Sequence, residues 1–123
     1  MKGITRHTPR IFSPEKIYGK GCDLAIVSRC LIRLMEIKRC NLSLSDACKA
    51  IKQLNQTEMM LREEFSSCIF KKFLVHDKKG CKTYGSGIIQ LEHARVMYMS
   101  TTGSEEAKRW IRKYREILRK NEA

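Results

Sequence analysis

The sequence lacks several patterns that would assign a class of protein at once. Its start, MKGITRHTPRIFSPEK, has no apolar core of the kind found in secretory signal peptides. The most apolar stretch, CDLAIVSRCLIRLMEI, contains two arginines and is too short to cross a bilayer. Neither an internal repeat nor a low-complexity segment is present. We therefore expect a cytoplasmic protein with no membrane partner.

Motifs of catalysis are also missing. The three histidines lie in no local arrangement with Ser or Cys that is typical of nucleophilic catalysis. The stretch YGSG resembles part of a phosphate-binding loop but is not followed by the Lys and Ser or Thr that such a loop needs. These absences predict a protein that is not an enzyme and has no cofactor.

The six cysteines include no Cys-x-x-Cys pair, which excludes the zinc-knuckle and thioredoxin-like patterns. A set that surrounds residues 71–91 has spacings that fit no standard zinc finger, so we predict no metal site; its members are Cys68, His76, Cys81 and His93. Three of the cysteines fall in apolar phase on expected helices and are predicted to be reduced thiols in the core, namely Cys30, Cys48 and Cys68.

Positive charge is what the sequence has in excess. Its 25 lysines and arginines outnumber 13 acidic residues, which gives a formal charge of +12 over 123 residues. Such an excess favours a polyanionic partner, with nucleic acid first and an acidic protein surface as an alternative. The apolar content of 42% is sufficient for one compact domain with a single core.

Hydrophobic spacing predicts a mostly α fold with one small β-hairpin. Helical periodicity covers residues 22–39, and a second helix is expected from the cap Ser43, with Asp46 closing a capping box, to near Gln53. A third helix is expected after the turn LNQT, reaching residue 71 or 72. Two apolar runs around a lysine-rich turn in residues 71–91 predict the hairpin. Residues 104–120 predict a basic amphipathic helix.

The segments LSLSDACKAI and FLVHDKKGCKTYGSGIIQL resemble winged helix-turn-helix transcriptional regulators of the IclR and MarR type. In that family a Ser-capped second helix precedes the recognition helix, and a strand, a charged turn and a returning strand form the wing. The resemblance covers residues 22–91, the expected winged-helix domain. Charge and helical spacing predict a basic arm over residues 1–21 before it and a helical extension, a candidate for dimerisation, over residues 92–123 after it. The resemblance also implies a DNA-binding transcriptional regulator or architectural factor on double-stranded DNA.

The resemblance assigns residues to each part of such an interface. In the major groove, base contacts are expected from the third helix, through Gln56, Thr57, Arg62 and Ser66. Phosphate contacts are expected from the wing and the arm, through Lys71, Lys72, Lys78, Lys79, Lys82, Tyr84, Arg6 and Arg10. An apolar stripe on the last helix could pack on its own domain, but it is expected to form a homodimer, through Trp110, Ile111, Tyr114, Ile117 and Leu118. The alternatives are a basic adaptor or inhibitor that binds an acidic protein, or an RNA-binding protein.

Overall fold

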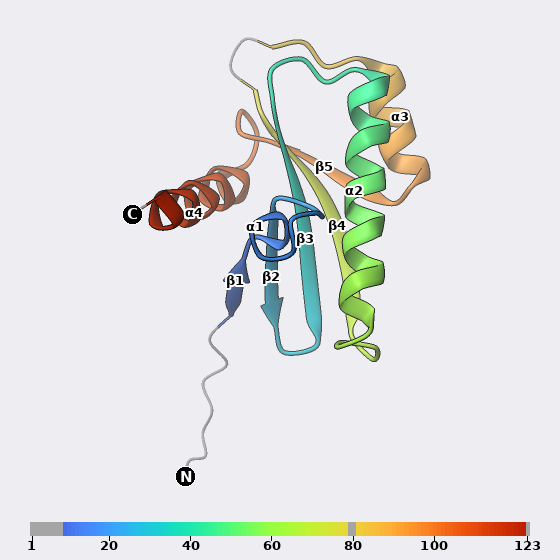
Figure 1. Ribbon diagram of the computed structural model, residues 1–123. Helices are drawn as coiled ribbons and strands as arrows, with labels where there is room; N and C mark the ends of the chain where they lie inside the picture. Colours follow the sequence, from blue (N-terminus) through green and yellow to red (C-terminus); the bar gives the residue numbers. More distant parts are fainter. Residues whose placement is uncertain (1–8, 79–80, 123) are drawn as a thin grey trace.

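A five-stranded mixed sheet forms the centre of the protein, with helices on both of its faces (Figure 1). The computed structural model describes residues 9–78 and 81–122. The strands are β1 (Arg10–Phe12), β2 (Leu24–Ser28), β3 (Leu31–Arg39), β4 (Ile69–Asp77) and β5 (Val96–Ser100). The helices are α1 (Pro14–Tyr18), α2 (Leu44–Arg62), α3 (Gly85–His93) and α4 (Glu105–Glu122).

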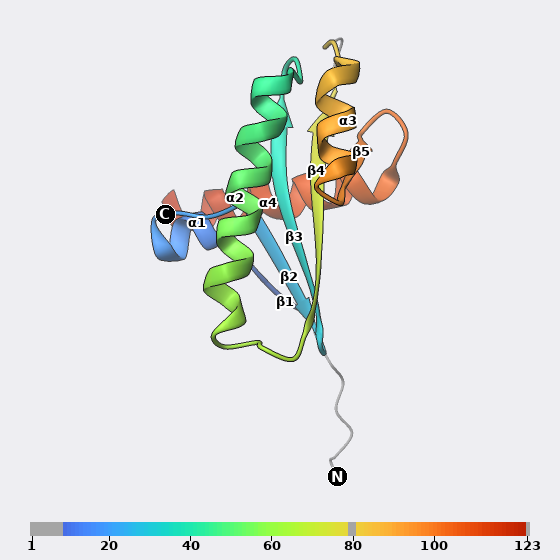
Figure 2. The same cartoon turned by 90° about the vertical axis from the view of Figure 1, so that its right-hand side faces the viewer.

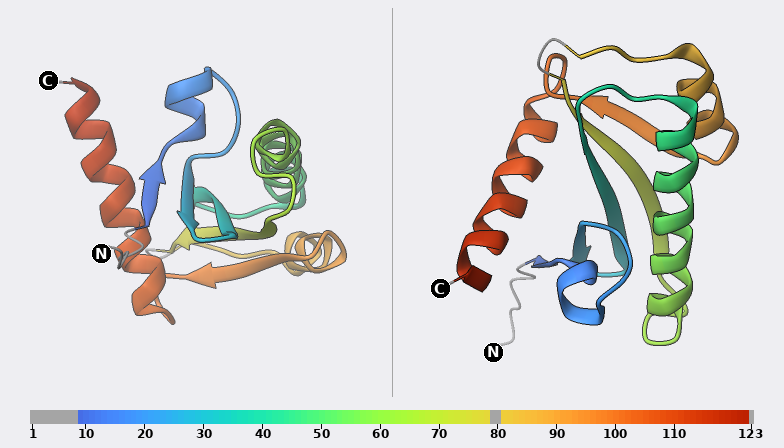
Figure 3. Two further views of the ribbon diagram at one scale, coloured as in Figure 1. Left: turned by 90° about the horizontal axis from the view of Figure 1, so that it is seen from below. Right: turned by 45° about the horizontal axis from the view of Figure 1, so that its top comes forward.

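The strands lie in chain order across the sheet, β1-β2-β3-β4-β5. Strand β2 is antiparallel to both of its neighbours, whereas β3, β4 and β5 are parallel to one another. Parallel neighbours need a crossover connection, and α2 and α3 supply the two that this sheet requires. These two helices lie side by side on one face (Figure 2), and α4 lies on the other (Figure 3).

The prediction of a mostly α winged-helix fold is therefore wrong, and the largest error lies in residues 22–39. This segment forms β2 and β3, joined by a tight turn in which Arg29 has a left-handed backbone, φ 57°. Because helices cover both faces of the sheet, its strands are apolar on both sides and lack the usual alternation. Ile32 and Leu34 face the α2 and α3 side, whereas Met35 faces α4. Such a continuous run also satisfies helical spacing.

The predicted hairpin over residues 71–91 is also absent. Its first half belongs to β4, which pairs in parallel with β3, and its second half is α3. Gly87 allows α3 to approach α2 closely, because a Cβ there would lie 3.0 Å from the Ser43 carbonyl oxygen. Lys78 and Lys82 therefore lie in the connection between β4 and α3. They do not lie at the tip of a wing.

The predicted start of α2 is confirmed, but its predicted end is wrong. The Ser43 hydroxyl accepts from the Asp46 amide at 3.2 Å, and the Asp46 carboxylate accepts from the Ser43 amide at 3.0 Å. The helix then continues past Gln53 to Arg62, so the second and third predicted helices are one. The segment LNQT contains no Gly or Pro to end a helix, and the Thr57 hydroxyl donates to the Gln53 carbonyl inside it.

Replacing Ser43 by Ala is expected to lower the free energy of unfolding by about 1 kcal/mol, because it removes this cap. Urea unfolding followed by circular dichroism measures the change. The matched control is Ser45→Ala, which alters an exposed serine two positions further along and is expected to change stability by less than about 0.5 kcal/mol. Equal effects of the two variants would contradict a capping role for Ser43.

The amphipathic C-terminal helix is confirmed as α4, and its apolar stripe packs on the protein's own sheet. Ser104 caps it by accepting from the Ala107 amide at 3.1 Å. The ring of Trp110 meets that of Phe73 edge to face, with centroids 5.1 Å apart. Two cores result, one between the sheet and α2 with α3, and one between the sheet and α4.

Candidate functional site

Two carboxyl groups are brought together where β2 begins and β3 approaches its end. Leu24 pairs with Met35 in the antiparallel ladder, so the preceding residue, Asp23, lies opposite Glu36. The Asp23 amide donates to Oε1 of Glu36 at 3.2 Å, and the Ile37 amide donates to Oδ2 of Asp23 at 2.8 Å. The backbone of the hairpin thus fixes both carboxyl groups at one point.

The two carboxyl groups share a half-buried site. Burial raises the pKa of the Glu36 carboxyl to about 9, and the charge of Asp23 adds to this effect. Burial also raises the pKa of Asp23, against the hydrogen bond from the Ile37 amide, which lowers it. Among the described residues, neither carboxyl group forms an ion pair with a lysine or arginine. At neutral pH the metal-free pair therefore retains a proton, which we assign to Glu36.

A third carboxylate comes from α1. Ser13 caps this short helix by accepting from the Lys16 amide at 3.4 Å. The Glu15 amide donates to the Cys22 carbonyl oxygen at 3.1 Å, which ties α1 to the residue before Asp23. The charge of Glu15 contributes to the raised pKa of both Asp23 and Glu36, so the three groups act on one another electrostatically.

The loop that leads into Asp23 is held against α2. Gly21 has φ 108°, and a Cβ there would lie 2.9 Å from Oγ1 of Thr57, so the position requires glycine. The Cys22 amide donates to the same Thr57 hydroxyl at 2.7 Å. Burial raises the pKa of the Cys22 thiol to about 12, so this cysteine is an uncharged part of the core.

Lysines lie beside the carboxyl pair. Lys38 is on the same face of β3 as Glu36, two residues further along, and its ammonium lies 3.2 Å from the Asp46 carboxylate. A cavity of about 240 Å³ lies between β3 and α2, and its lining includes Glu36, Lys38, Asp46 and Lys49. The cavity thus presents both carboxylate oxygens and ammonium groups to a ligand.

The side chain of Gln53, in the same region, has a buried oxygen atom. Its Oε1 has no hydrogen-bond partner among the described residues. Helical spacing places Gln53 on the face of α2 that also presents Asp46 and Lys49. Buried acceptors are nearly always satisfied, so this oxygen calls for a water, an ion or a ligand group.

The carboxyl pair fits a hard divalent cation only in part. Within residues 9–78 and 81–122, no group of three or more His, Cys, Asp or Glu side chains is arranged to hold a metal ion. Mg²⁺, however, is commonly bound through one or two carboxylates, with water and substrate phosphates as its other ligands. Asp23 and Glu36 provide that minimal set.

The four residues that were expected to contact bases lie in the last turns of α2 and in the segment after it. Thr57 is buried and both donates and accepts a hydrogen bond inside the protein. Arg62 pairs with Glu58 and lies over the Phe70 ring, with its guanidinium carbon 4.7 Å from the ring centroid. Gln56 is exposed in the last turns of α2, and Ser66 is exposed in the turn after it.

The residues predicted to contact phosphates are dispersed. Arg6 and Lys79 lie outside the described residues. Arg10 lies over the Phe12 ring in β1, and the Lys72 ammonium lies 2.9 Å from the Glu58 carboxylate. The remaining exposed positions are spread over β4 and the segment before α3; they are Lys71, Lys82 and Tyr84.

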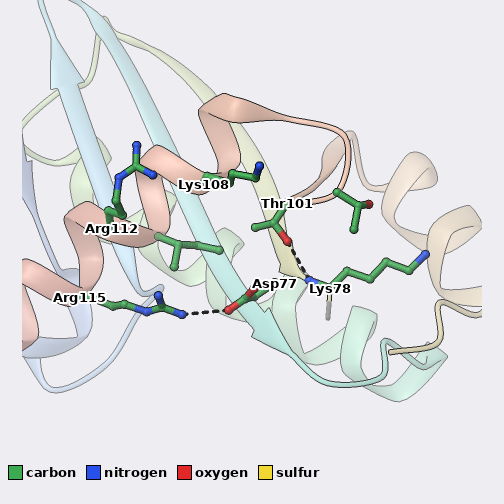
Figure 4. Close-up of a pocket in the computed structure, with 8 residues that line it drawn as sticks. Asp77, Lys78, Thr101, Lys108, Arg112 and Arg115 are labelled. Carbon is green, nitrogen blue, oxygen red and sulfur yellow. Dashed lines mark hydrogen bonds and ion pairs between the residues drawn. The ribbon is translucent and has the colours of Figure 1, made fainter. Parts of the chain in front are cut away.

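Among the described members of that set, Lys78 lines a cation-rich pocket. Figure 4 shows this pocket of about 650 Å³, which is lined by Lys78, Lys108, Arg112 and Arg115 together with Thr101. Arg115 donates to the Asp77 carboxylate at 3.0 Å, and the Lys78 amide donates to the Thr101 hydroxyl at 3.1 Å. A second hollow of about 580 Å³, beside the loop that leads into Asp23, is lined in part by Lys20 and Lys52.

The residues predicted to form a dimer interface contribute to the core. Trp110 and Ile111 are buried beneath α4, and Ile117 packs against the same cluster, with Leu118 half-buried beside it. The Tyr114 hydroxyl donates to Oδ1 of Asp23 at 3.4 Å. Burial and the charge of Asp23 raise the pKa of Tyr114 to about 12, so this donor remains protonated. Dimer formation stays a prediction.

The predicted burial of three cysteines is wrong, and one histidine lies in the core. Cys30 and Cys48 are exposed and Cys68 is half-buried, whereas they were expected in the core. His76 is fully buried; its Nδ1 lies 2.7 Å from the Tyr98 hydroxyl and its Nε2 lies 2.7 Å from the Cys40 carbonyl oxygen. This histidine is a satisfied core residue.

The sequence interpretation missed Asp23, Glu36 and Lys38. The available signal was a carboxylate at each end of an apolar run, thirteen positions apart, with a lysine two residues after the second. Read as strands, that run places the two acids opposite each other.

Within the described residues, no helix is long and apolar enough to cross a membrane. Comparisons with protein-family models, with curated proteins and with solved structures found no match.

Proposed function

We propose that the protein is a divalent-cation-dependent nuclease that hydrolyses phosphodiester bonds in nucleic acid. The observation that carries the proposal is the pair of half-buried carboxyl groups of Asp23 and Glu36, which lack a cationic partner among the described residues. Two acids confined together disfavour each other's ionisation, and a divalent cation would relieve that repulsion. The proposal departs from our sequence-based prediction of a non-enzyme.

The surroundings of the pair support a phosphate substrate. Lys38 and Lys49 line the cavity that Glu36 also lines, and their ammonium groups suit non-bridging phosphate oxygens. The formal charge of +12 favours a polyanion over a small neutral substrate. Lys78, in the cation-lined pocket, remains a candidate for phosphate contact away from the reacting bond.

Each residue then has a defined task. Asp23 and Glu36 would hold Mg²⁺ or Mn²⁺ through their oxygen atoms, after Glu36 has lost its proton. The ion, when bound, supplies Lewis acidity and lowers the pKa of a coordinated water. Lys38 would exchange Asp46 for a phosphate oxygen and so stabilise charge that develops on the phosphate. Tyr114 would keep Asp23 oriented through its hydroxyl hydrogen bond.

A formal charge of +12 favours DNA and RNA alike. Double-stranded DNA is the substrate we test first, because the spread of lysines over both the cavity and the cation-lined pocket suits an extended backbone. An acidic protein partner, without cleavage, is the competing proposal from charge alone.

Replacing Asp23 by Asn is expected to reduce cleavage about 1,000-fold or more, because one of the two cation-holding carboxylates is lost. The assay follows labelled duplex DNA, single-stranded DNA and RNA with Mg²⁺, Mn²⁺, Ca²⁺ or EDTA. Binding to duplex DNA, measured separately in Ca²⁺, should change less than about threefold, since most of the affinity comes from lysines.

The matched control is Glu64→Gln, which removes an exposed carboxylate just beyond α2 and should leave cleavage unchanged. Cleavage that persists in EDTA, or that Asp23→Asn leaves intact, would overturn the proposal. Binding without cleavage under any metal condition would favour a nucleic-acid-binding protein, and no binding at low salt would favour the acidic protein partner.

A further inference from the structure

Two cysteines from separate loops bring their sulfur atoms into contact at the surface. Sγ of Cys30, in the turn between β2 and β3, lies 2.7 Å from Sγ of Cys68, although the residues are 38 positions apart in the chain. The Ile69 amide donates to the Cys30 carbonyl oxygen at 2.9 Å. The backbone therefore holds the two side chains together.

The geometry of the sheet suits a bond between them. The first register pair of the parallel strands β3 and β4 is Leu31 with Ile69, and the cysteines are the residues just before it. Adjacent strands lie about 4.8 Å apart. Disulfides need Cα atoms about 4.4–6.8 Å apart, so a bond requires little movement of the backbone.

A disulfide reagent in solution can also reach the cysteine pair. Cys30 is exposed, and a hollow of about 610 Å³ beside it is lined in part by Arg29 and Arg33. Two guanidinium groups favour an anionic reagent, and glutathione disulfide carries net negative charge at neutral pH. The contact with Cys30 raises the pKa of the Cys68 thiol, so we assign the first attack to Cys30.

We propose that Cys30 and Cys68 form a reversible disulfide, with a small-molecule disulfide such as glutathione disulfide as the oxidant. The Cys30 thiolate attacks one sulfur of the oxidant and displaces one glutathione thiolate, giving a mixed disulfide. Cys68 then loses its proton, attacks the Cys30 sulfur and displaces the second thiolate. The protein loses two electrons and two protons, and one glutathione disulfide becomes two glutathione molecules.

The bond would stabilise the fold without touching the carboxyl pair. Cys30 lies six residues before Glu36 on an extended chain, which corresponds to about 20 Å. The bond closes a loop between positions 38 apart, and a loop of that length restricts the unfolded chain substantially. The proposal therefore stands independently of nuclease activity.

The test uses the purified full-length protein in a series of glutathione redox buffers, quenched with an alkylating reagent. The oxidised protein should carry two fewer alkyl groups than the reduced protein, and non-reduced peptide mapping should place the link between Cys30 and Cys68. The thermal midpoint should rise by roughly 10 °C on oxidation and return on reduction.

The variant that removes both partners, Cys30→Ser with Cys68→Ser, should fold and show no redox-dependent shift in the thermal midpoint. The matched control, Cys48→Ser, removes an exposed cysteine on α2 and should retain the full shift. Alkylation of both thiols in oxidising buffer, a stable mixed disulfide on Cys30, or a link between two molecules would each overturn the proposal. If the double variant fails to fold, the peptide map of the wild-type protein still decides the outcome.

Discussion

Replacing Glu36 by Gln is expected to abolish cleavage and, at the same time, to stabilise the metal-free protein at alkaline pH. The folded protein holds the pKa of Glu36 at about 9, against an ordinary value of 4.5. Between these values the folded state binds more protons than the unfolded state, so wild-type stability falls as the pH rises. A neutral amide removes this dependence, so the variant should be several kcal/mol more stable than the wild-type protein at pH 9. Loss of a cation-holding carboxylate should reduce cleavage about 1,000-fold or more.

Urea unfolding in EDTA at about pH 6 and pH 9 measures the first effect, and the duplex cleavage assay measures the second. Glu64→Gln serves again as the control and should follow the wild-type stability at both pH values. A wild-type protein that becomes more stable from pH 6 to pH 9 would contradict the assignment of a proton to Glu36. Mn²⁺ should remove most of the wild-type pH dependence, because the bound cation replaces the proton.

Replacing Trp110 by Ala is expected to lower the free energy of unfolding by about 3–5 kcal/mol, because it empties the space between α4 and the sheet. The Trp110 side chain is 6% exposed and packs edge to face on Phe73. Urea unfolding followed by far-ultraviolet circular dichroism measures the loss. Arg109→Ala, at an exposed neighbouring position on α4, should change stability by less than about 0.5 kcal/mol.

The same variant bears on the predicted homodimer. If α4 served a dimer interface instead of the core, Trp110→Ala would dissociate the dimer and leave the unfolding of the monomer little changed. Sedimentation velocity of wild type and variant, beside the unfolding data, separates the two outcomes. A concentration-independent loss of several kcal/mol supports the intramolecular packing.

Local signals in the sequence predicted the helix boundaries that depend on local chemistry. Ser43 and Asp46 form the capping box that their spacing indicates, and the Ser104 hydroxyl accepts from the Ala107 amide at the start of α4. The stripe of α4 was correct because solvent covers its other face, which keeps the helical period visible. What that stripe packs against was not predictable, since an apolar face on a helix is the same whether it meets a sheet or a second molecule.

Strands β2 and β3 were not predicted because their burial depends on helices that lie elsewhere in the sequence. β2 and β3 are buried from both sides, so alternation disappears and Val27, Leu31 and Leu34 also meet the spacing of a helix. The site was lost with the strands, since Asp23 and Glu36 face each other only in an antiparallel register. In the predicted helix over residues 22–39, Glu36 and Lys38 lie on the solvent-exposed face and indicate no site. The lysine-rich segment led to the wrong prediction of a hairpin, because the connection from β4 to α3 needs the same polar turn residues as a hairpin.

The antiparallel pairing of β2 with β3 has a consequence for the order of folding. The pairing that aligns Asp23 with Glu36 closes only a short loop, whereas the contact of β3 with β4 joins residues 38 positions apart. Short loops close sooner because less chain entropy is lost. We therefore expect the two acids to meet early, in water, and to lose their hydration only later, when the loop before β2 docks on α2. Alkaline conditions should accordingly slow the late docking step and leave the initial hairpin unaffected.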